Sequence, residues 1–324
     1  MTVVSPPPPV EETAAPAARR KRRIIGMSIW AVLFAVGTYF IGVPTSDPLI
    51  AFGWLWLATI AWRSDLPWRQ HLLFLRDWLP ISLLLVLYNI SRAYADDLFA
   101  PHVFPLIHAD EAMFGWATGD VVPTVWLQDH LYRPDVVQWW EVVVSLVYVS
   151  HFLAVPTIGV LLWLRQRELW ARFMRRWFVL SLFGLITYFL YPAAPPWWAS
   201  LYGQLPQHVE RISTNGWNAI GLHSAGNTLN ALQVDAANPV AAMPSLHTAY
   251  AMMAVSFFLP MVAKKWWPLL LAYPLAMTFT LVYSGEHYVI DVLVGWAYVA
   301  GIFLLVGFAE RWWARRRDAD RVSA

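Results

Sequence analysis

Two histidines in this chain each stand at the start of a long apolar run. His247 belongs to PSLHTAYAMMAVSFF, in which nearly every residue after the histidine is apolar. His287 belongs to YSGEHYVIDVLVGWAYVAGIFLLVGF, and Asp291 follows it four residues later. If each run is a helix, Asp291 lies on the same face as His287, one turn deeper. A carboxylate there can accept a hydrogen bond from Nδ1 of His287, which fixes the tautomer and leaves Nε2 able to attack.

This set of side chains is typical of phosphoryl transfer through a histidine. A neutral imidazole attacks phosphorus in line and becomes phosphohistidine, while a second, protonated histidine donates to the leaving oxygen. The start of the helix that carries His247 offers free backbone N–H groups and a positive dipole end, which suit phosphate. We expect Pro244 in the first turn of that helix and Ser245 as a further phosphate contact. The sequence predicts that the two helix starts face each other and hold a phosphate between His247 and His287.

Two other interpretations of the same residues are open. Two histidines and an aspartate match the composition of an iron site with two histidines and one carboxylate. We expect no metal, because no further cluster of ligand residues stands near by in the sequence. A histidine at a helix end can also be an interfacial or capping residue. A carboxylate such as Asp291 inside an apolar helix is costly, however, and indicates a functional role.

The elements that must position these residues are membrane helices. The 324 residues are 58% hydrophobic and 14% charged, whereas roughly 25% of a soluble domain is charged. We therefore expect an all-α polytopic membrane protein with about eight transmembrane helices. The chain contains no cysteine, which excludes disulfides, thiolate metal sites and cysteine nucleophiles. The predicted helices cover residues 24–44, 48–62, 78–93, 142–164, 177–192, 245–263, 266–284 and 287–309.

Basic residues predict how these helices are oriented. In an eight-helix arrangement every arginine and lysine cluster falls on one side, which the positive-inside rule makes cytoplasmic. Both termini are then cytoplasmic, the site with the two histidines is extracytoplasmic, and we expect the plasma (cytoplasmic) membrane. The clusters lie at residues 19–23, 63–69, 165–176, 264–265 and 311–317.

The remaining segments complete the predicted organisation. We expect a disordered basic N-terminal tail over residues 1–23, a single transmembrane catalytic domain over residues 24–311 and a cytoplasmic tail over residues 312–324. The long outer connection at residues 94–138 includes PHVFPLIHADEAMFGWA, an amphipathic stretch that can lie flat on the membrane. The second, at residues 193–243, is long enough to form a lid over the site.

Further polar residues on the outer side are candidates for substrate binding. Arg92 ends the third predicted helix, and we favour it as the phosphate-binding cation because the other candidates, Arg133 and Arg211, lie on loops. The alternative role for Arg92 is that its side chain only extends to the lipid head groups. His151 lies roughly 14 Å inside the fourth predicted helix. An ionisable group at that depth indicates function, so we expect it to line the lipid cavity or bind a substrate hydroxyl, with a bond to a neighbouring helix as the alternative. Three outer acids could contact a polyol: Asp110, Glu111 and Glu141.

Two of these motifs also resemble those of a known family. PSLHTAY and HYVIDVLVG are similar to the second and third motifs of the type 2 phosphatidic acid phosphatase superfamily. The resemblance covers residues 140–310 best, and it is closest to the transferase branch, which includes inositolphosphorylceramide and sphingomyelin synthases. It implies a six-helix core and no metal, with His287 as the nucleophile, Asp291 as its orienting group and His247 as the acid and base.

The chain departs from the phosphatases of that superfamily in three ways. It lacks their lysine-to-arginine-proline first motif, because the only lysines lie in predicted cytoplasmic segments. Leu281 stands where the phosphatases place an arginine, and Leu246 stands where their second motif has glycine. All three differences resemble the transferase branch.

The sequence thus predicts a membrane lipid phosphotransferase or phosphatase that works through a phosphohistidine. It would move or hydrolyse a phosphorylated lipid head group on the outer face of the membrane, as inositolphosphorylceramide synthases do. The alternatives are a plain lipid-phosphate phosphatase and, from another class, a transporter, which would spread charged residues through several helices near the midplane. We expect lipid substrates in the bilayer as partners, no nucleic acid and no cofactor.

Overall fold

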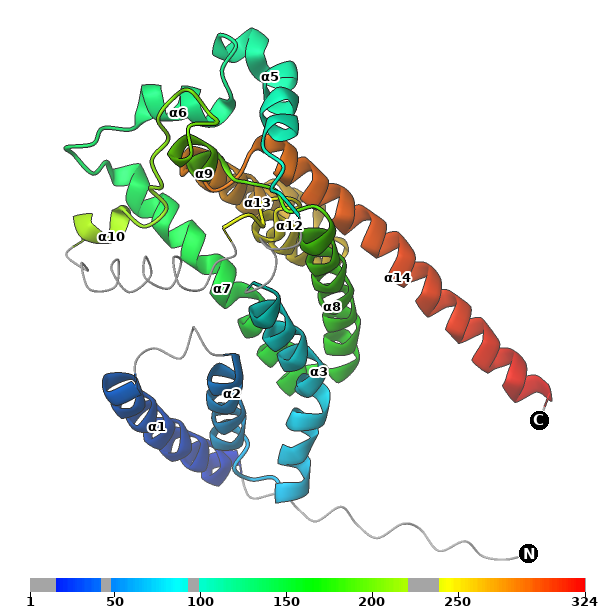
Figure 1. Ribbon diagram of the computed structural model, residues 1–324. Coiled ribbons are helices and arrows are strands. Elements are labelled where there is room, and N and C mark those ends of the chain that lie inside the picture. The colour runs from blue at the N-terminus through cyan, green and yellow to red at the C-terminus, as the bar shows by residue number, and fades with distance from the viewer. Residues whose placement is uncertain (1–15, 42–47, 93–98, 221–238, 324) are drawn as a thin grey trace, which may run out of the picture. The chain divides into compact units, whose positions relative to one another are not determined.

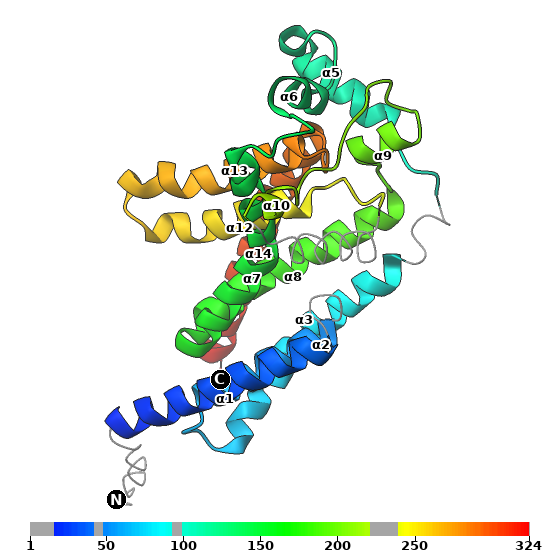
Figure 2. The same cartoon turned by 90° about the vertical axis from the view of Figure 1, so that its left-hand side faces the viewer.

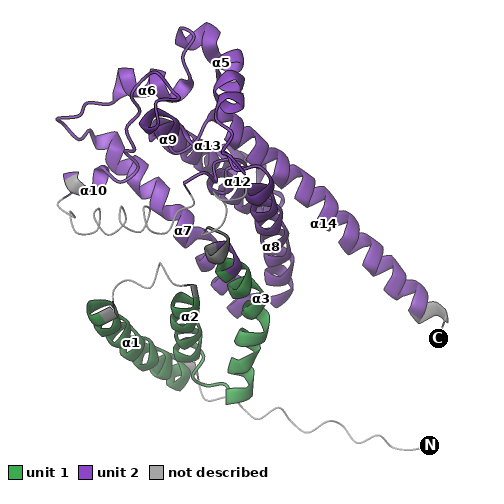
Figure 3. Ribbon diagram, in the orientation of Figure 1, with its two compact units in different colours: residues 1–86 green, residues 87–324 purple. Residues whose placement is uncertain are grey.

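The computed structural model describes residues 16–41, 48–92, 99–220 and 239–323 (Figure 1). All regular elements in these ranges are helices, so the predicted all-α class is confirmed. The only extended pairing within the described ranges is two isolated bridges, from Ala193 to His102 and to Ala241. The chain divides into two compact units, residues 1–86 and residues 87–324 (Figure 3).

The first unit contains α1 (Pro16–Ile41), α2 (Pro48–Trp62) and most of α3 (Trp68–Arg92). α1 packs against α2, where the Trp30 indole donates to the Trp54 carbonyl at 3.0 Å. α1 begins earlier than the predicted residue 24, so residues 16–23 of the expected disordered tail are helical. Alanine, arginine and lysine favour helix, and proline suits its first position, which explains the longer helix. Residues 1–15 of that tail lie outside the described ranges.

The second unit holds the candidate site. α12 contacts α7, α8, α13 and α14, so the helix that carries His247 lies at the centre of this unit. α12 and α13 form an antiparallel pair joined by two short 3-10 turns, η1 and η2 (Figure 2). The elements are α5 (Phe104–Thr118), α6 (Pro123–Leu131), α7 (Trp139–Arg165), α8 (Arg167–Leu190), α9 (Pro196–Leu201), α10 (Gly216–Ala219), α12 (Leu246–Phe258), η1 (Leu259–Met261), η2 (Lys264–Trp266), α13 (Trp267–Tyr283) and α14 (Val289–Ser323).

The described helices include six that are long and apolar enough to cross a membrane, which makes this chain an integral membrane protein. They are Ala17–Phe40, Trp68–Tyr88, Trp139–Arg165, Arg167–Leu190, Lys264–Tyr283 and Val289–Asp320. Two further apolar helices, Leu49–Trp62 and Leu246–Met261, are shorter, so the count of eight spans stays a prediction. α12 ends at Phe258 and not at the predicted residue 263, because Pro260 lacks the N–H that would continue the helix.

The two long connections predicted on the outer side pack together over the start of α14. The first contains α5 and α6, and the stretch predicted to be amphipathic forms the helix α5; that it lies flat on a membrane stays a prediction. A buried apolar cluster joins Leu106 of α5 and Val125 of α6 to Val209 of the second connection and to Tyr288. The two isolated bridges lie at the same place, where the backbone of Ala193 meets both connections.

Candidate active site

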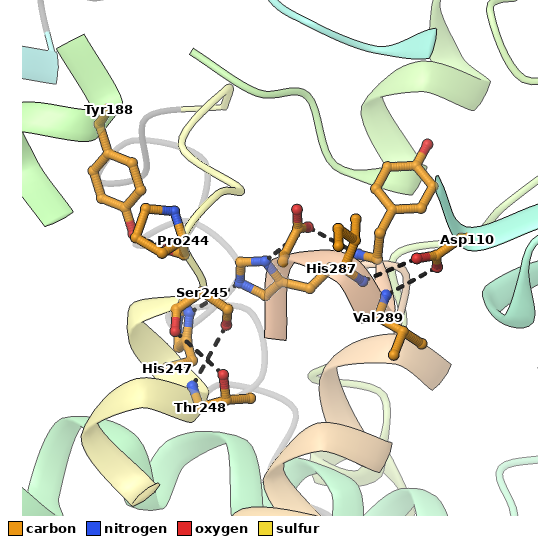
Figure 4. Close-up of polar contacts among 11 residues, drawn as sticks. Asp110, Tyr188, Pro244, Ser245, His247, Thr248, His287 and Val289 are labelled. Atoms are coloured by element: carbon orange, nitrogen blue, oxygen red, sulfur yellow. Dashed lines mark hydrogen bonds and ion pairs between the residues drawn. The ribbon is translucent and has the colours of Figure 1, made fainter. Parts of the chain in front are cut away.

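The structure brings the two predicted catalytic histidines together. His247 lies in the first turn of α12, and His287 lies just before α14. Nε2 of His287 is 3.3 Å from Nδ1 of His247, and the two ring centroids are 5.5 Å apart (Figure 4). At that distance one ring nitrogen donates a hydrogen bond to the other. The predicted meeting of these two side chains is therefore confirmed by the geometry.

The start of α12 is fixed by neighbouring helices. Ser245 is its N-cap residue; it is fully buried, and its hydroxyl oxygen accepts from the Thr248 N–H at 3.5 Å. The Ser245 N–H donates to the backbone carbonyl of Asp291 at 3.0 Å. The helix begins at Leu246, so the expectation that Pro244 lies in its first turn is wrong. Pro244 precedes the cap, and its carbonyl accepts from the Tyr188 hydroxyl at 2.8 Å. Phosphate contact by Ser245 stays a prediction beside this capping role.

Asp291 reaches His287 in a different way from the one predicted. α14 begins at Val289, so the two residues do not share a helix face; His287 lies in the turn before the helix and Asp291 in its first turn. Oδ2 of Asp291 accepts from the Tyr288 N–H at 2.9 Å and lies 3.4 Å from Nδ1 of His287. The carboxylate is fully buried. A proton on Nδ1 that points at Asp291 leaves the lone pair of the ring on Nε2, which faces His247.

α12 and α14 can approach this closely because Gly295 has no side chain. A Cβ at Gly295 would lie 2.7 Å from the Ser245 carbonyl oxygen, which is closer than real Cβ contacts come. The glycine therefore allows α14 to pass directly beside the capped start of α12, which brings His287 within reach of His247.

Asp110 of α5, predicted as a polyol contact, instead holds the start of α14. It is fully buried, and its two carboxylate oxygens accept from the backbone N–H groups of Val289 and Ile290, both at 2.9 Å (Figure 4). Burial raises the pKa of Asp110 to about 7, while these two hydrogen bonds oppose the rise. With Asp291 on the Tyr288 N–H, carboxylates occupy three N–H groups at the start of α14. The start of α14 therefore offers these three N–H groups to carboxylates and not to phosphate.

The predicted polyol contacts are also wrong for two of the three outer acids. Both oxygens of Asp110 are bound to backbone, as described above. Glu141 is buried at the start of α7, where it accepts from the Gln138 N–H at 2.8 Å and from the Tyr283 hydroxyl at 3.3 Å. A carboxylate that is buried and already hydrogen-bonded to the protein does not face an incoming polyol.

Arg211 is the cation that the described residues place beside the histidines. Its guanidinium makes two hydrogen bonds to Glu286, Nε to Oε1 at 2.9 Å and Nη2 to Oε2 at 3.0 Å, and Glu286 directly precedes His287. Ser213 donates to the same carboxylate at 2.8 Å. Arg211 lies close enough to His247 for their charges to interact. The preferred candidate, Arg92, has a side chain outside the described part of the structure.

A neutral residue anchors the loop that carries Arg211. Gln128 of α6 donates to the carbonyls of Glu210 and Tyr283 at 2.8 and 2.9 Å, and it accepts from the Glu210 N–H at 2.9 Å. The loop next to Arg211 is therefore held against the end of α13. Arg133, the other loop arginine, is exposed and donates to the adjacent Tyr132 carbonyl.

His151 joins the site from α7. Its ring centroid is 4.2 Å from that of His247 and 5.4 Å from that of Tyr250, whose ring plane is nearly parallel. Tyr148, one turn earlier on α7, stacks on His247 at 5.6 Å. The structure thus brings His151 to the catalytic pair, while its place in a lipid cavity stays a prediction. The alternative, a bond to a neighbouring helix, is supported by its interaction with the His247 backbone on α12. Neither tyrosine was predicted, because an aromatic residue in a membrane helix carries no distinct signal.

No group of three or more histidine or acidic side chains within the described residues is placed to hold a metal ion. The arrangement around His247 and His287 can support phosphoryl transfer. One imidazole has a carboxylate on one nitrogen and a second imidazole opposite the other, and an arginine lies beside them.

Comparisons with known proteins agree with this geometry. The chain is 33% identical over 139 residues to phosphoinositol dihydroceramide synthase of Bacteroides thetaiotaomicron. This match covers 40% of this chain and 43% of that protein. It is 32% identical over 117 residues to the catalytic subunit of inositol phosphorylceramide synthase of Saccharomyces cerevisiae, which covers 36% of this chain and 29% of that protein. Each match therefore spans less than half the length of the relative. No solved structure matches the chain significantly.

The family match extends further along the chain. It covers residues 124–305, from the second residue of α6 into α14, and so includes both histidines, Asp291, His151 and Arg211. These are the segments whose motifs, PSLHTAY and HYVIDVLVG, led to the predicted family. The chain belongs to the PAP2 superfamily.

Proposed function

We propose that this chain is a membrane phosphotransferase that carries a phosphorylated lipid head group on His287. The observation that carries the proposal is the 3.3 Å approach of Nε2 of His287 to Nδ1 of His247, with Asp291 on the opposite ring nitrogen. Asp291 orients the nucleophile and stabilises the positive charge that its ring acquires. His247 is placed to give and take the proton.

The reaction divides into two steps. In the first, the lone pair on Nε2 of His287 forms a bond to phosphorus, the ester bond to the leaving alcohol breaks, and protonated His247 gives its proton to that oxygen. In the second, the acceptor hydroxyl loses its proton to His247 and attacks phosphorus. The bond between nitrogen and phosphorus then breaks, and its electron pair returns to Nε2. An alcohol as acceptor gives transfer, whereas water gives hydrolysis.

Substrate must separate the two rings. Reacting atoms meet at about 3–3.5 Å, so a phosphoryl group cannot fit between nitrogens that are 3.3 Å apart. Substrate therefore replaces the direct hydrogen bond between the histidines with one bond to each ring.

We assign the phosphate-binding cation to Arg211 in place of Arg92. A guanidinium has five N–H donors, and Glu286 receives two of those of Arg211 in the described structure. The remaining donors suit phosphate oxygens, because arginine binds phosphate through paired hydrogen bonds. Glu286 therefore positions Arg211 beside His287 before substrate arrives.

Transfer is favoured over hydrolysis by the surroundings of Leu281. Phosphatases of this superfamily are expected to hold an arginine at this position, but Leu281 is fully buried in an apolar cluster with Tyr148, Ala251 and Met277. The names of the two relatives contain inositol phosphate and ceramide. We therefore propose an inositol phosphate head group as the group moved and a ceramide-type lipid alcohol as its acceptor, on the extracytoplasmic face of the plasma membrane.

The direct test is to trap the intermediate. Purified protein is mixed with vesicles of phosphatidylinositol labelled in the inositol ring, without acceptor, and covalent label is sought on His287 by mass spectrometry after alkaline work-up. We expect label on wild type and on His108→Ala, a control at an exposed histidine. His287→Ala should remain unlabelled, and His247→Ala should label far more slowly. Turnover of His287→Ala at the wild-type rate on phosphatidylinositol, phosphatidylcholine and phosphatidic acid would contradict the proposal.

A further inference from the structure

The catalytic pair continues into the helix bundle through a second polar cluster on α7 and α12. His151 lies against His247 on one side and against Tyr250 on the other, with ring centroids 4.2 and 5.4 Å away. The Tyr250 hydroxyl in turn lies 2.6 Å from the hydroxyl of Ser181 on α8. Four polar side chains therefore follow one another from the first turn of α12 to the middle of α8.

The direction of this cluster follows from the helices. On α12, Tyr250 lies one turn after His247, and on α7, His151 lies one turn after Tyr148, which also stacks on His247. α7 and α8 are both long and apolar enough to span a membrane. His151 thus lies on the bilayer side of His247, whereas Arg211 and Glu286 belong to the connections at the opposite end of the site.

His151 has hydrogen-bonding capacity that the described residues do not use. Its Nδ1 is buried and has no hydrogen-bond partner among them. Buried polar atoms are normally paired, and an ionisable side chain inside a membrane helix normally has a functional partner. The rings around it are those of His247, Tyr250 and Phe152. A ligand group that arrives from the bilayer beside His247 would meet this nitrogen.

We propose that His151 selects the acceptor by binding a second hydroxyl of the same lipid, close to the hydroxyl that attacks phosphorus. The inference rests on the proposed function and adds an acceptor subsite to it. The ring centroids of His151 and His247 are only 4.2 Å apart, so the two hydroxyls must lie close together on one lipid, within two carbons of each other. A ceramide, which carries hydroxyls on its first and third carbons, fits this spacing. A diacylglycerol, whose neighbouring groups are esters, offers no second donor.

The roles of the two histidines stay separate in this arrangement. The proton of the attacking hydroxyl goes to His247, and the bond to phosphorus forms at that oxygen while the bond to His287 breaks. His151 exchanges no proton, because it accepts a hydrogen bond from the second hydroxyl. It is therefore a positioning residue for the second step and does not take part in the first.

The test compares two acceptors in one mixture. Wild type and His151→Phe are given labelled phosphatidylinositol with equal amounts of a fluorescent short-chain ceramide and its 3-deoxy analogue, and the two products are separated on a thin-layer plate. We expect wild type to prefer the ceramide by about tenfold or more, since a site built for a hydroxyl rejects the analogue that lacks it. His151→Phe should lose that preference. The ratio of products does not depend on how much of the variant folds.

Further variants complete the test. Ser150→Ala is the matched control, because the neighbouring Ser150 hydroxyl donates to the Val147 carbonyl and lies 2.9 Å from the Tyr273 hydroxyl of α13. His151→Asn, which retains an acceptor near the position of Nδ1, should restore part of the preference. Covalent labelling of His287 without acceptor should stay at the wild-type rate in His151→Phe. An unchanged preference in that variant, or a loss of labelling equal to its loss of transfer, would overturn the inference. If wild type itself fails to label, the proposed function fails instead.

Discussion

Substitution of Asp110 tests whether α5, which is not one of the predicted spans, holds the proposed nucleophile His287 in position. Each of its oxygens accepts one backbone N–H from the start of α14 at 2.9 Å, and a hydrogen bond to a charged group contributes about 1.5–3 kcal/mol. In Asp110→Asn one oxygen remains as an acceptor, while the amide NH2 faces the other N–H. We therefore expect a loss of about 2 kcal/mol in the interactions that hold this helix start.

That loss falls next to the reacting groups. Tyr288, Val289 and Ile290 separate His287 from Asp291, so a shift of the helix start changes the contact between nucleophile and carboxylate. If the whole loss falls on the transition state, kcat drops by about thirtyfold, since about 1.4 kcal/mol corresponds to a factor of ten. The assay is transfer from labelled phosphatidylinositol to fluorescent ceramide, with Asp129→Asn, at an exposed carboxylate of α6, as the control. A wild-type kcat and unfolding midpoint in Asp110→Asn would refute this reasoning.

The pH dependence of the same variant gives a second readout. Burial raises the pKa of Asp110 from 3.8 to about 7 in the folded chain. A carboxyl whose pKa is raised by folding stabilises the fold most below about pH 4, and that contribution is lost as the pH rises through about 7. The unfolding midpoint of wild type relative to Asp110→Asn should therefore rise as the pH falls from 7 to 4. Activity should change in the opposite direction, because a protonated oxygen no longer accepts an N–H. A pH-independent difference in midpoint would contradict this assignment.

Two further substitutions test the packing and the cation. Gly295→Ala places a Cβ 2.7 Å from the Ser245 carbonyl oxygen. We therefore expect this variant to lower the free energy of unfolding by about 1–3 kcal/mol, measured by thermal unfolding. Gly301→Ala is the control and should have little effect, because a Cβ at that position meets nothing within 4 Å. Equal midpoints for the two variants would argue against close packing of α12 on α14. Arg211→Lys keeps the positive charge but loses the paired N–H donors, so we expect KM for phosphatidylinositol to rise about tenfold. Arg133→Lys, at an exposed arginine, is the control. An unchanged KM in Arg211→Lys would return the role of phosphate-binding cation to Arg92.

The motifs located the reacting groups because these groups must be specific residue types. His247, His287 and Asp291 stand at the ends of apolar runs, where a titratable side chain is conspicuous against its surroundings. The same contrast revealed His151 inside α7. The helices around them could be predicted because a membrane span needs a long apolar run.

The site residues whose roles were not predicted from the sequence share a physical reason. Asp110 and Gln128 act on backbone groups far away in the sequence, and a polar residue on an outer connection looks the same whether it faces water or a buried N–H. Arg211 was ranked below Arg92 because a loop offers no visible anchor. Its anchor is Gln128, which donates to the Glu210 and Tyr283 carbonyls and accepts from the Glu210 N–H, together with the ion pair to Glu286. Helix starts were misplaced for a related reason, since Ser245 and Asp110 as caps decide where α12 and α14 begin.

These contacts divide the control of the site between two regions of the second unit. The connections outside the spans fix the nucleophile: Asp110 holds the start of α14, and Glu286 places Arg211 beside His287. The candidate span α7 supplies Tyr148 and His151, whose rings lie against His247. Substitutions in the connections should therefore alter formation of the covalent intermediate, whereas those in α7 should alter which acceptor resolves it. The two classes can be separated because labelling of His287 requires no acceptor, and this separation makes the assignment of each residue independently testable.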